Sequence, residues 1–228
     1  MKLFRICIVP IILALIGSCF TVPRYSVKVN SFSRDYDISH KVIIVPLDKN
    51  LSANDLQFIE FSKHVTKALE KNGFQVVTDF NDANVIVTLY YSISAPISQT
   101  LSIPQFGPTG IESSTTHGTI HSYGNWGTYS GSTTYQQRYG ITGYRQVEHT
   151  VYIRLIDLSA YDKAALHEKN EVVQLWKTQI VSTGSSSDLR SVFPIMIAAA
   201  LEYIGKNTNK EIEITLTQYD DRVKQILE

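Results

Sequence analysis

Histidine and carboxylate side chains are the groups in this sequence that could bind a metal or transfer a proton. His117 and His121 are four residues apart, a spacing that would place two imidazoles on one face of a helix. Gly118 and the Ser, Thr and Gly residues around it are poor helix formers, and Glu112 is the one nearby carboxylate. We therefore expect ordinary polar loop histidines here and no metal site.

Asp35, Asp37 and His40 form a second candidate cluster, with the composition of an acid/base site. No Gly-x-Ser-x-Gly elbow accompanies them, and the sequence contains no phosphate-binding glycine-rich loop or dinucleotide motif. Aspartates in such a segment are typical of caps and turns. We expect no catalytic residue, no cofactor and no enzyme; a hydrolase would require a pocket that joins a histidine and a carboxylate to a nucleophile.

The remaining reactive side chain is Cys19, at the end of an apolar run from Phe4 to Ile16. Basic residues precede the run and small residues close it, which is the order of charged, apolar and small residues in a secretory signal. Gly17 and Ser18 directly before the cysteine resemble the lipobox of bacterial lipoproteins, whose cysteine is lipidated and becomes the first residue of the mature chain. The alternative is an ordinary signal peptide that contains an incidental cysteine.

Cleavage before Cys19 would leave it as the one cysteine of the mature chain, so no disulfide could form within it. Residues 1–18 are then the signal peptide, residues 19–25 a tether, and residues 26–228 the folded domain. Phe20 follows the cysteine, where an aspartate tends to retain Gram-negative lipoproteins in the inner membrane. This analogy favours the outer membrane, with the periplasmic face favoured over the cell surface, and palmitate among the attached lipids.

Charge and length limit the possible partners and the number of domains. The 228-residue chain has 21 basic and 21 acidic residues, which argues against a nucleic-acid partner or a second, electrostatic membrane anchor. A chain of this length normally forms one domain, and 43% hydrophobic residues are sufficient for one core. The expected membrane contact is therefore the N-terminal lipid.

Hydrophobic periodicity predicts one α/β domain with a mixed, largely antiparallel sheet and two helices on one face. The β-branched run Val42–Val45 predicts a central strand that is covered on both faces. Further strands are expected at residues 25–29, 74–78, 85–93, 147–158, 171–181 and 212–216, with a turn over residues 159–170. The strands at 147–158 and 171–181 should be antiparallel neighbours.

Two segments have the pattern of helices. The first is expected to begin with Ser52 as its N-cap and to end at Gly73, with one buried stripe of apolar residues: Phe58, Phe61, Val65, Ala68 and Leu69. The second, Val192–Ile204, is apolar on all sides and must be buried, with Ser191 as its N-cap so that Pro194 lies in the first turn. A short charged helix is expected at the C-terminus.

The composition changes abruptly over residues 95–144. This insert contains eight of the twelve glycines, many Ser and Thr residues, and only two charged residues, Glu112 and Arg138. Several of its tyrosines have odd numbers, as do Val147 and Val151 in the next strand, so the second half of the insert could continue that strand as one arm of a long hairpin. A flexible loop of low complexity is the alternative.

Together these segments resemble a family of uncharacterised bacterial outer-membrane lipoproteins, catalogued as a domain of unknown function. The resemblance is carried by the lipobox, the Gly/Tyr-rich insert and a series of short segments: Val27–Pro46 with Asp37-Ile38-Ser39, Leu69–Phe74, Asn81–Val85, Leu155–Leu158 and Leu175–Lys177. A longer Ser/Thr-rich insert and a longer connection from Asp157 to Glu171 distinguish this sequence. The resemblance implies a location and a fold, and supplies no catalytic residues.

The leading hypothesis is a lipid-anchored, non-catalytic envelope protein that binds or organises other envelope components through the insert. Tyrosine and tryptophan supply contact area at low entropic cost, so the candidate contact residues are the aromatic ones: Tyr123, Trp126, Tyr129, Tyr135 and Tyr139. In the alternative, inserts from several subunits form a membrane β-barrel, as in lipoprotein secretion channels, because barrel strands also alternate and carry aromatic girdles.

Overall fold

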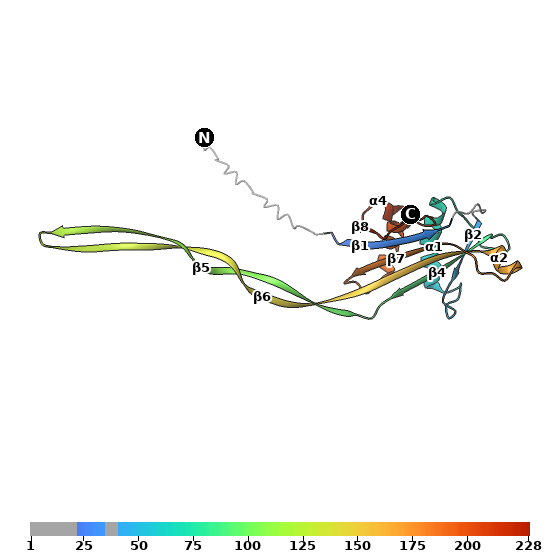
Figure 1. Ribbon diagram of the computed structural model, residues 1–228, viewed down its shortest axis with the longest axis horizontal. Helices are drawn as coiled ribbons and strands as arrows, with labels where there is room; N and C mark the ends of the chain where they lie inside the picture. Colours follow the sequence, from blue (N-terminus) through green and yellow to red (C-terminus); the bar gives the residue numbers. More distant parts are fainter. Residues whose placement is uncertain (1–21, 35–40) are drawn as a thin grey trace, which may run out of the picture.

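The computed structural model describes residues 22–34 and 41–228. The predicted signal peptide, Cys19 and the segment with Asp35, Asp37 and His40 lie outside the described residues. The strands are β1 (Arg24–Ser33), β2 (Lys41–Pro46), β3 (Gln75–Val76), β4 (Val85–Ile93), β5 (Ile97–Tyr123), β6 (Trp126–Asp162), β7 (Gln174–Gly184) and β8 (Ile212–Thr217). The helices are α1 (Leu56–Lys71), α2 (Lys163–Glu168), α3 (Leu189–Ala200) and α4 (Asp221–Leu227) (Figure 1).

One mixed sheet organises the domain, in the order β3-β2-β4-β6-β7-β1-β8, with β5 paired to β6 outside this path. The pairs β2–β3 and β2–β4 are parallel, and the other pairs are antiparallel. This confirms the prediction of a single α/β domain with a mixed sheet. The predicted antiparallel pairing of the strands at 147–158 and 171–181 is also confirmed, as Tyr152–Tyr161 of β6 against Gln174–Gly184 of β7.

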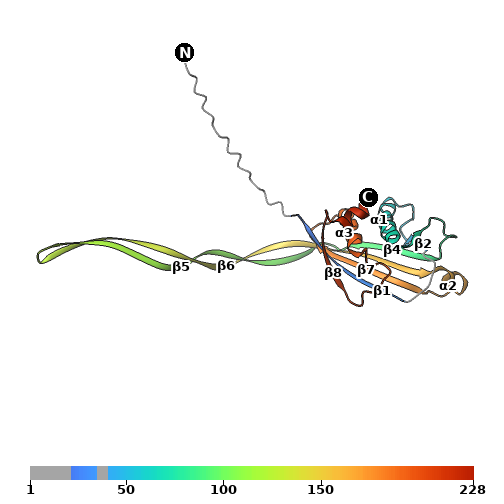
Figure 2. The same cartoon turned by 90° about the horizontal axis from the view of Figure 1, so that it is seen from above.

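Helices α1, α3 and α4 pack against one another on one side of the sheet (Figure 2). Helix α3 contacts β1, β7 and β8, while α1 contacts β2 and β3. The rings of Phe61 in α1 and Phe193 in α3 stack with centroids 4.0 Å apart. The core therefore lies between this helical layer and the sheet.

Helix α1 buries the predicted stripe without exception: Phe58, Phe61, Val65, Ala68 and Leu69. Gly73, with φ of 87°, follows the helix as predicted. The predicted N-cap was wrong. Asp55 caps the helix by accepting from the amides of Gln57 and Phe58, whereas the Ser52 hydroxyl accepts from the amide of Asn54 in the preceding turn.

Helix α3 begins three residues earlier than predicted. Asp188, and not Ser191, is the N-cap, and its carboxylate accepts from the amide of Ser191. Pro194 is consequently the sixth helical residue, beyond the first turn, where its ring removes the bond that its amide would donate to the carbonyl of Arg190. The prediction of a helix buried on all sides holds for Val192–Ala200, while Leu201 at the end of the helix is only partly buried.

Three other boundaries differ from the sequence prediction. Strand β2 is not central, because only the two-residue β3 lies beyond it, and Val42 is its one fully buried residue. Strand β1 begins inside the segment predicted as a tether, residues 19–25, because Arg24 and Tyr25 already pair with β8. The segment 159–170 is not a turn, since β6 continues to Asp162, whose carboxylate caps α2.

Candidate functional site

The insert is an antiparallel hairpin that projects far beyond the domain (Figures 1 and 2). Strands β5 and β6 form 25 paired rungs, from Ile97↔Val151 to Tyr123↔Trp126. At about 3.4 Å per residue the ladder is about 80 Å long. β6 runs from the hairpin into the centre of the sheet, so the hairpin and the domain share one continuous strand.

Local sequence explains why this segment forms a hairpin. Gly124 and Asn125 make a two-residue turn, and Gly124 has φ of 66°, as the first position of a type II′ turn requires. The side chain of Tyr129 lies across Gly118 and Gly131, where an added Cβ would clash with it. Glycines at this rung therefore allow a large aromatic side chain to lie flat on the ladder.

Three bulges in the ladder determine which side chains share a face. Register shifts occur at Gln105/Phe106, Pro108/Gly110 and Ile111/Ser113, and they leave Thr142, Thr109 and Glu112 without an opposite residue. Successive rungs point to opposite sides, so each extra residue reverses the relation between residue number and face. The second half of the insert does continue the next strand as one arm of a hairpin, as the parity of its tyrosines suggested. The shared parity does not mean a shared face, because the bulge at Thr142 places Tyr129, Tyr135 and Tyr139 on the opposite face from Val147 and Val151.

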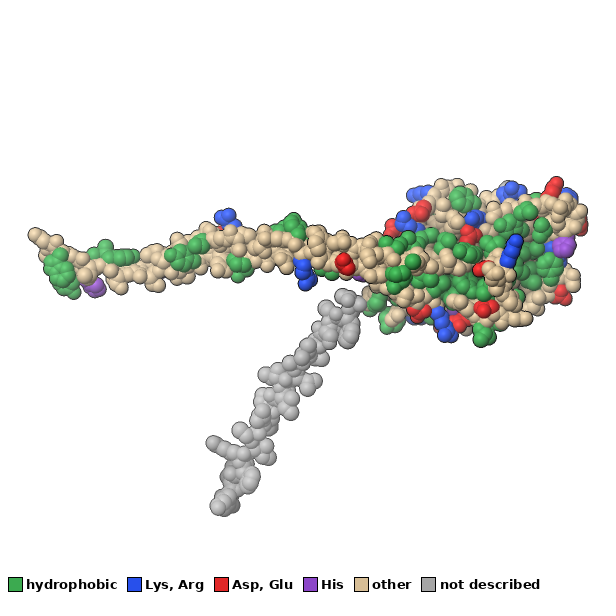
Figure 3. All heavy atoms as spheres, turned by 90° about the horizontal axis from the view of Figure 1, so that it is seen from below, with side chains coloured by type: hydrophobic (Ala, Val, Ile, Leu, Met, Phe, Trp, Pro, Cys, Tyr) green, Lys and Arg blue, Asp and Glu red, His purple; other side chains and the backbone are tan. Residues whose placement is uncertain are grey.

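Beyond this bulge the hairpin has two unlike faces. The aromatic face consists of the rungs Phe106↔Ile141, Pro108↔Tyr139, Ile111↔Gln137, Ser114↔Tyr135, Thr116↔Thr133, Gly118↔Gly131 and Ile120↔Tyr129. The polar face consists of the rungs Gly107↔Gly140, Gly110↔Arg138, Ser113↔Gln136, Thr115↔Thr134, His117↔Ser132, Thr119↔Ser130 and His121↔Thr128. Figure 3 shows hydrophobic groups spaced along the hairpin among polar atoms, with very few charges.

The structure divides the five predicted contact residues between the two faces. Tyr129, Tyr135 and Tyr139 lie on the aromatic face, whereas Tyr123 and Trp126 form the last rung, on the side of the polar face, and stack with centroids 5.2 Å apart. All five side chains are 58–70% exposed. Sequence reasoning missed four exposed apolar residues of the aromatic face, because only the pairing register places them there: Phe106, Ile111, Ile120 and Ile141.

The histidines of the insert do not form a metal site. His117 and His121 both lie on the polar face, but four residues along a strand separate them by about 13 Å, too far to share one metal ion. No cluster of three or more potential metal ligands occurs within the described ranges. No helix among the described residues is long and apolar enough to cross a bilayer.

Arg154 lies at the base of the hairpin and is 1% exposed. Its guanidinium donates to the main-chain oxygen of Ser186 at 2.6 and 3.2 Å, and Gly184 leaves room for it. Burial lowers the pKa of this guanidinium. The contacts tie β6 to the loop after β7 at the point where the hairpin leaves the domain.

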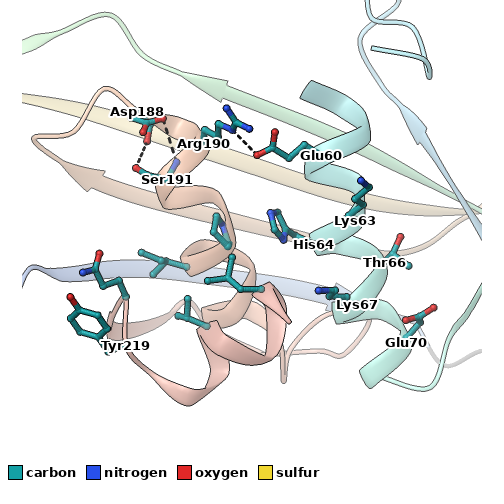
Figure 4. A pocket seen from close by; sticks show the side chains of 15 residues that line it. Glu60, Lys63, His64, Thr66, Lys67, Glu70, Asp188, Arg190, Ser191 and Tyr219 are labelled. Atoms are coloured by element: carbon teal, nitrogen blue, oxygen red, sulfur yellow. Dashed lines mark hydrogen bonds and ion pairs between the residues drawn. The ribbon is translucent and has the colours of Figure 1, made fainter. Parts of the chain in front are cut away.

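A second surface feature is a groove of about 880 Å³ between α1, α3 and α4 (Figure 4). Its apolar lining comes from Pro194, Ile195, Val223 and Leu227, and its rim is charged. On the rim a hydrogen bond from Arg190 to Glu60 holds the pKa of Glu60 below its usual value.

The groove also contains His64 and Ser191, the types of side chain that a hydrolase would use. Burial lowers the pKa of His64, and its Nδ1 lies 3.3 Å from the main-chain oxygen of Ile226. The hydroxyl of Ser191 donates to the main-chain oxygen of Asp188. Within the described part of the chain, no hydrogen bond joins His64 to Ser191 or to a carboxylate, so the groove does not assemble the constellation that the hydrolase hypothesis requires.

Comparisons with known proteins add little to this geometry. No family model matches the chain, and no curated protein matches it. A solved structure of a PDZ domain protein from Parabacteroides distasonis is similar over 88% of this chain and 41% of that chain, with 11% identity and a TM-score of 0.38. This chain thus spans less than half of that protein, and the likeness is too low to carry an argument about function.

Proposed function

We propose that this protein is a lipid-anchored, non-catalytic component of the bacterial cell envelope that binds other envelope components through its hairpin. The observation that carries the proposal is the exposure of the hairpin: all five aromatic side chains named above are more than half exposed along a ladder of 25 rungs. A two-stranded ladder is at best marginally stable in water by itself. A binding partner that covers these side chains would stabilise it.

The anchor in this proposal is a lipid on Cys19, and the membrane is the outer membrane, on its periplasmic face. The resemblance to the uncharacterised lipoprotein family supports both assignments. The distance from Cys19 to the first residue of β1, Arg24, is five residues, which span at most about 18 Å. Such a short tether would hold the start of β1 close to the membrane surface.

Replacing Cys19 with serine should release the protein from the membrane, because the acyl chains supply the proposed anchor and each buried methylene contributes about 0.8 kcal/mol. The measurement is the distribution of the protein between membrane and soluble fractions, together with metabolic labelling by a fatty acid. Retention in the membrane with unchanged labelling would show that Cys19 is not the lipidation site.

Joint replacement of Tyr123, Trp126, Tyr129, Tyr135 and Tyr139 by serine should abolish the capture of envelope partners by crosslinking in intact cells. The side chains are exposed in the protomer, so circular dichroism should remain native. As a matched control, five polar-face residues at neighbouring rungs, Ser113, Thr115, Thr119, Ser130 and Thr134, are replaced by alanine. Capture of every partner by the serine variant would place the contact surface elsewhere.

A further inference from the structure

The proposed function makes the hairpin the contact element, and the partner inferred below rests on that assignment. Both outer edges of the hairpin lack a strand partner within the described ranges: β5 over residues 97–123 and β6 over residues 126–151 pair only with each other. A free edge exposes a row of unpaired amide and carbonyl groups that is a template for another strand. Two such edges on one ribbon therefore call for a neighbour on each side.

A second copy of this chain fits these edges. Because β5 and β6 run in opposite directions, the β6 edge of one copy can pair with the β5 edge of the next in the same antiparallel pattern as the hairpin itself. The contact is head-to-tail and repeats from copy to copy, so it closes into a ring when the rotation allows. The closed form removes every free edge and contains an even number of strands.

The distal section of the hairpin, beyond the bulge at Thr142, has two faces that are suited to the two sides of such a barrel. Five of the seven aromatic-face rungs carry an apolar or aromatic side chain. A sixth, Gly118↔Gly131, lies under the ring of Tyr129. In the remaining rung the hydroxyls of Thr116 and Thr133 bond to each other at 2.9 Å, which lowers the cost of removing them from water. The seven polar-face rungs carry no apolar side chain larger than the threonine methyl.

The length of the aromatic face agrees with the thickness of a membrane. It extends over 13 rungs, from Phe106↔Ile141 to Ile120↔Tyr129, which is about 40 Å along the strands. At the strand tilt of membrane barrels, about 35–45°, this corresponds to a height of about 30 Å, similar to the hydrocarbon core of a bilayer. Aromatic residues lie toward both ends of the section, with Phe106 and Tyr139 near one end and Tyr129 at the other.

The position of the anchor orients the hairpin toward the membrane. Val27 of β1 and Arg154 of β6 both pair with Ser182 of β7, so β1 begins level with the base of the hairpin. Figure 1 shows β1 starting at the end of the domain from which the hairpin projects. A tether of at most about 18 Å from the lipid would therefore hold that end, and not the opposite one, toward the bilayer.

From these observations we infer that the hairpins of several copies pair edge to edge into a β-barrel across the membrane that holds the anchor. The aromatic face contacts lipid, and the polar face lines a water-filled lumen. The proximal rungs, from Ile97↔Val151 to Gln105↔Gly143, carry their aliphatic residues on the other side of the ribbon, at Ile97, Leu101, Ile103, Val147 and Val151, and only Pro104↔Tyr144 continues the aromatic face. At the same tilt this section is about 22–25 Å high, so it crosses the headgroup region and the gap between membrane and domain that the tether of at most about 18 Å bridges. The assembly is then a channel.

The face assignment is tested with the full lipidated chain in vesicles of phosphatidylethanolamine and phosphatidylglycerol. Single cysteines replace Ser114 and Ile120 on the aromatic face, and Thr115 and Thr119 on the polar face, and each is labelled with an environment-sensitive fluorophore. We expect lipid-bound nitroxide to quench the first pair and aqueous iodide to quench the second. Quenching of all four by iodide alone would overturn the membrane barrel.

The copy-to-copy contact is tested in cells that express two differently tagged chains. One carries Thr115→Cys, and the other carries a cysteine at one of four polar-face positions of β6, namely Thr128, Ser130, Ser132 or Thr134. We expect a disulfide between copies in at least one combination, and a mass of several copies in mild detergent. A monomeric mass with no β5–β6 disulfide would refute self-pairing. If the protein were monomeric but still captured other envelope proteins, self-pairing would be refuted and the proposed function would stand. If the oligomer formed but the variant with the five aromatic residues replaced by serine still captured every partner, the proposed function would be refuted and self-pairing would stand.

Discussion

Replacing Ile197 with aspartate should unfold the domain or bring it close to unfolding. Ile197 is completely buried in α3, the helix that lies between α1 and α4 and against β1, β7 and β8. An unpaired carboxylate at such a site costs about 3–5 kcal/mol, a large fraction of the 5–15 kcal/mol that stabilises a typical domain. The melting temperature measured by circular dichroism should fall by on the order of 10 °C or more.

Arg190→Ala in the same helix is the matched control. Its guanidinium bonds to Glu60 at 2.7 Å, but the side chain is 73% exposed, and exposed ion pairs contribute little to stability. The control should melt within about 2 °C of the wild type. If Ile197→Asp also melted within this range, α3 would be exposed in solution and the packing of helices on the sheet would be wrong.

The helices show how much of this fold the sequence could predict. The stripe from Phe58 to Leu69 was predictable because helical periodicity and burial agree over four turns. The caps were not, because Ser52 and Asp55 are both good N-caps three residues apart, as are Asp188 and Ser191. In both helices the chain uses the aspartate, whose negative charge also interacts favourably with the positive end of the helix dipole.

The hairpin shows where prediction from the sequence ends. Its composition and the alternation of its tyrosines left an extended arm and a flexible loop as equal alternatives, and the structure shows the arm. The faces could not be predicted, because Thr109, Glu112 and Thr142 are ordinary polar residues, and glycine, which can mark a bulge, recurs along the whole insert. One unrecognised bulge reverses every assignment beyond it. The buried Arg154 at the base was equally unforeseen, since charged residues are almost never fully buried.

Excising the hairpin should leave the domain folded and abolish its function. The variant replaces residues 98–150 with Asn-Gly, which joins the paired residues Ile97 and Val151 by a two-residue turn and retains the buried Val151. None of the residues in the main core cluster belongs to the excised segment. Shortening a connection changes its closure entropy by only about 0.6 kcal/mol per halving of length. Circular dichroism should show cooperative melting close to that of the full chain, with no partner captured and no oligomer in detergent.

A shorter excision separates the two sections of the hairpin. Replacing residues 106–142 with Asn-Gly joins Gln105 to Gly143, so the proximal rungs remain while both distal faces are lost. If the distal faces carry the function, this variant should fold and lose capture as completely as the full excision.

Unfolding of either variant would mean that hairpin side chains stabilise the core, in conflict with their exposure. Capture that survives the full excision would place the contact surface on the domain, where the groove between α1, α3 and α4 is the next candidate, because its apolar lining is open to a partner.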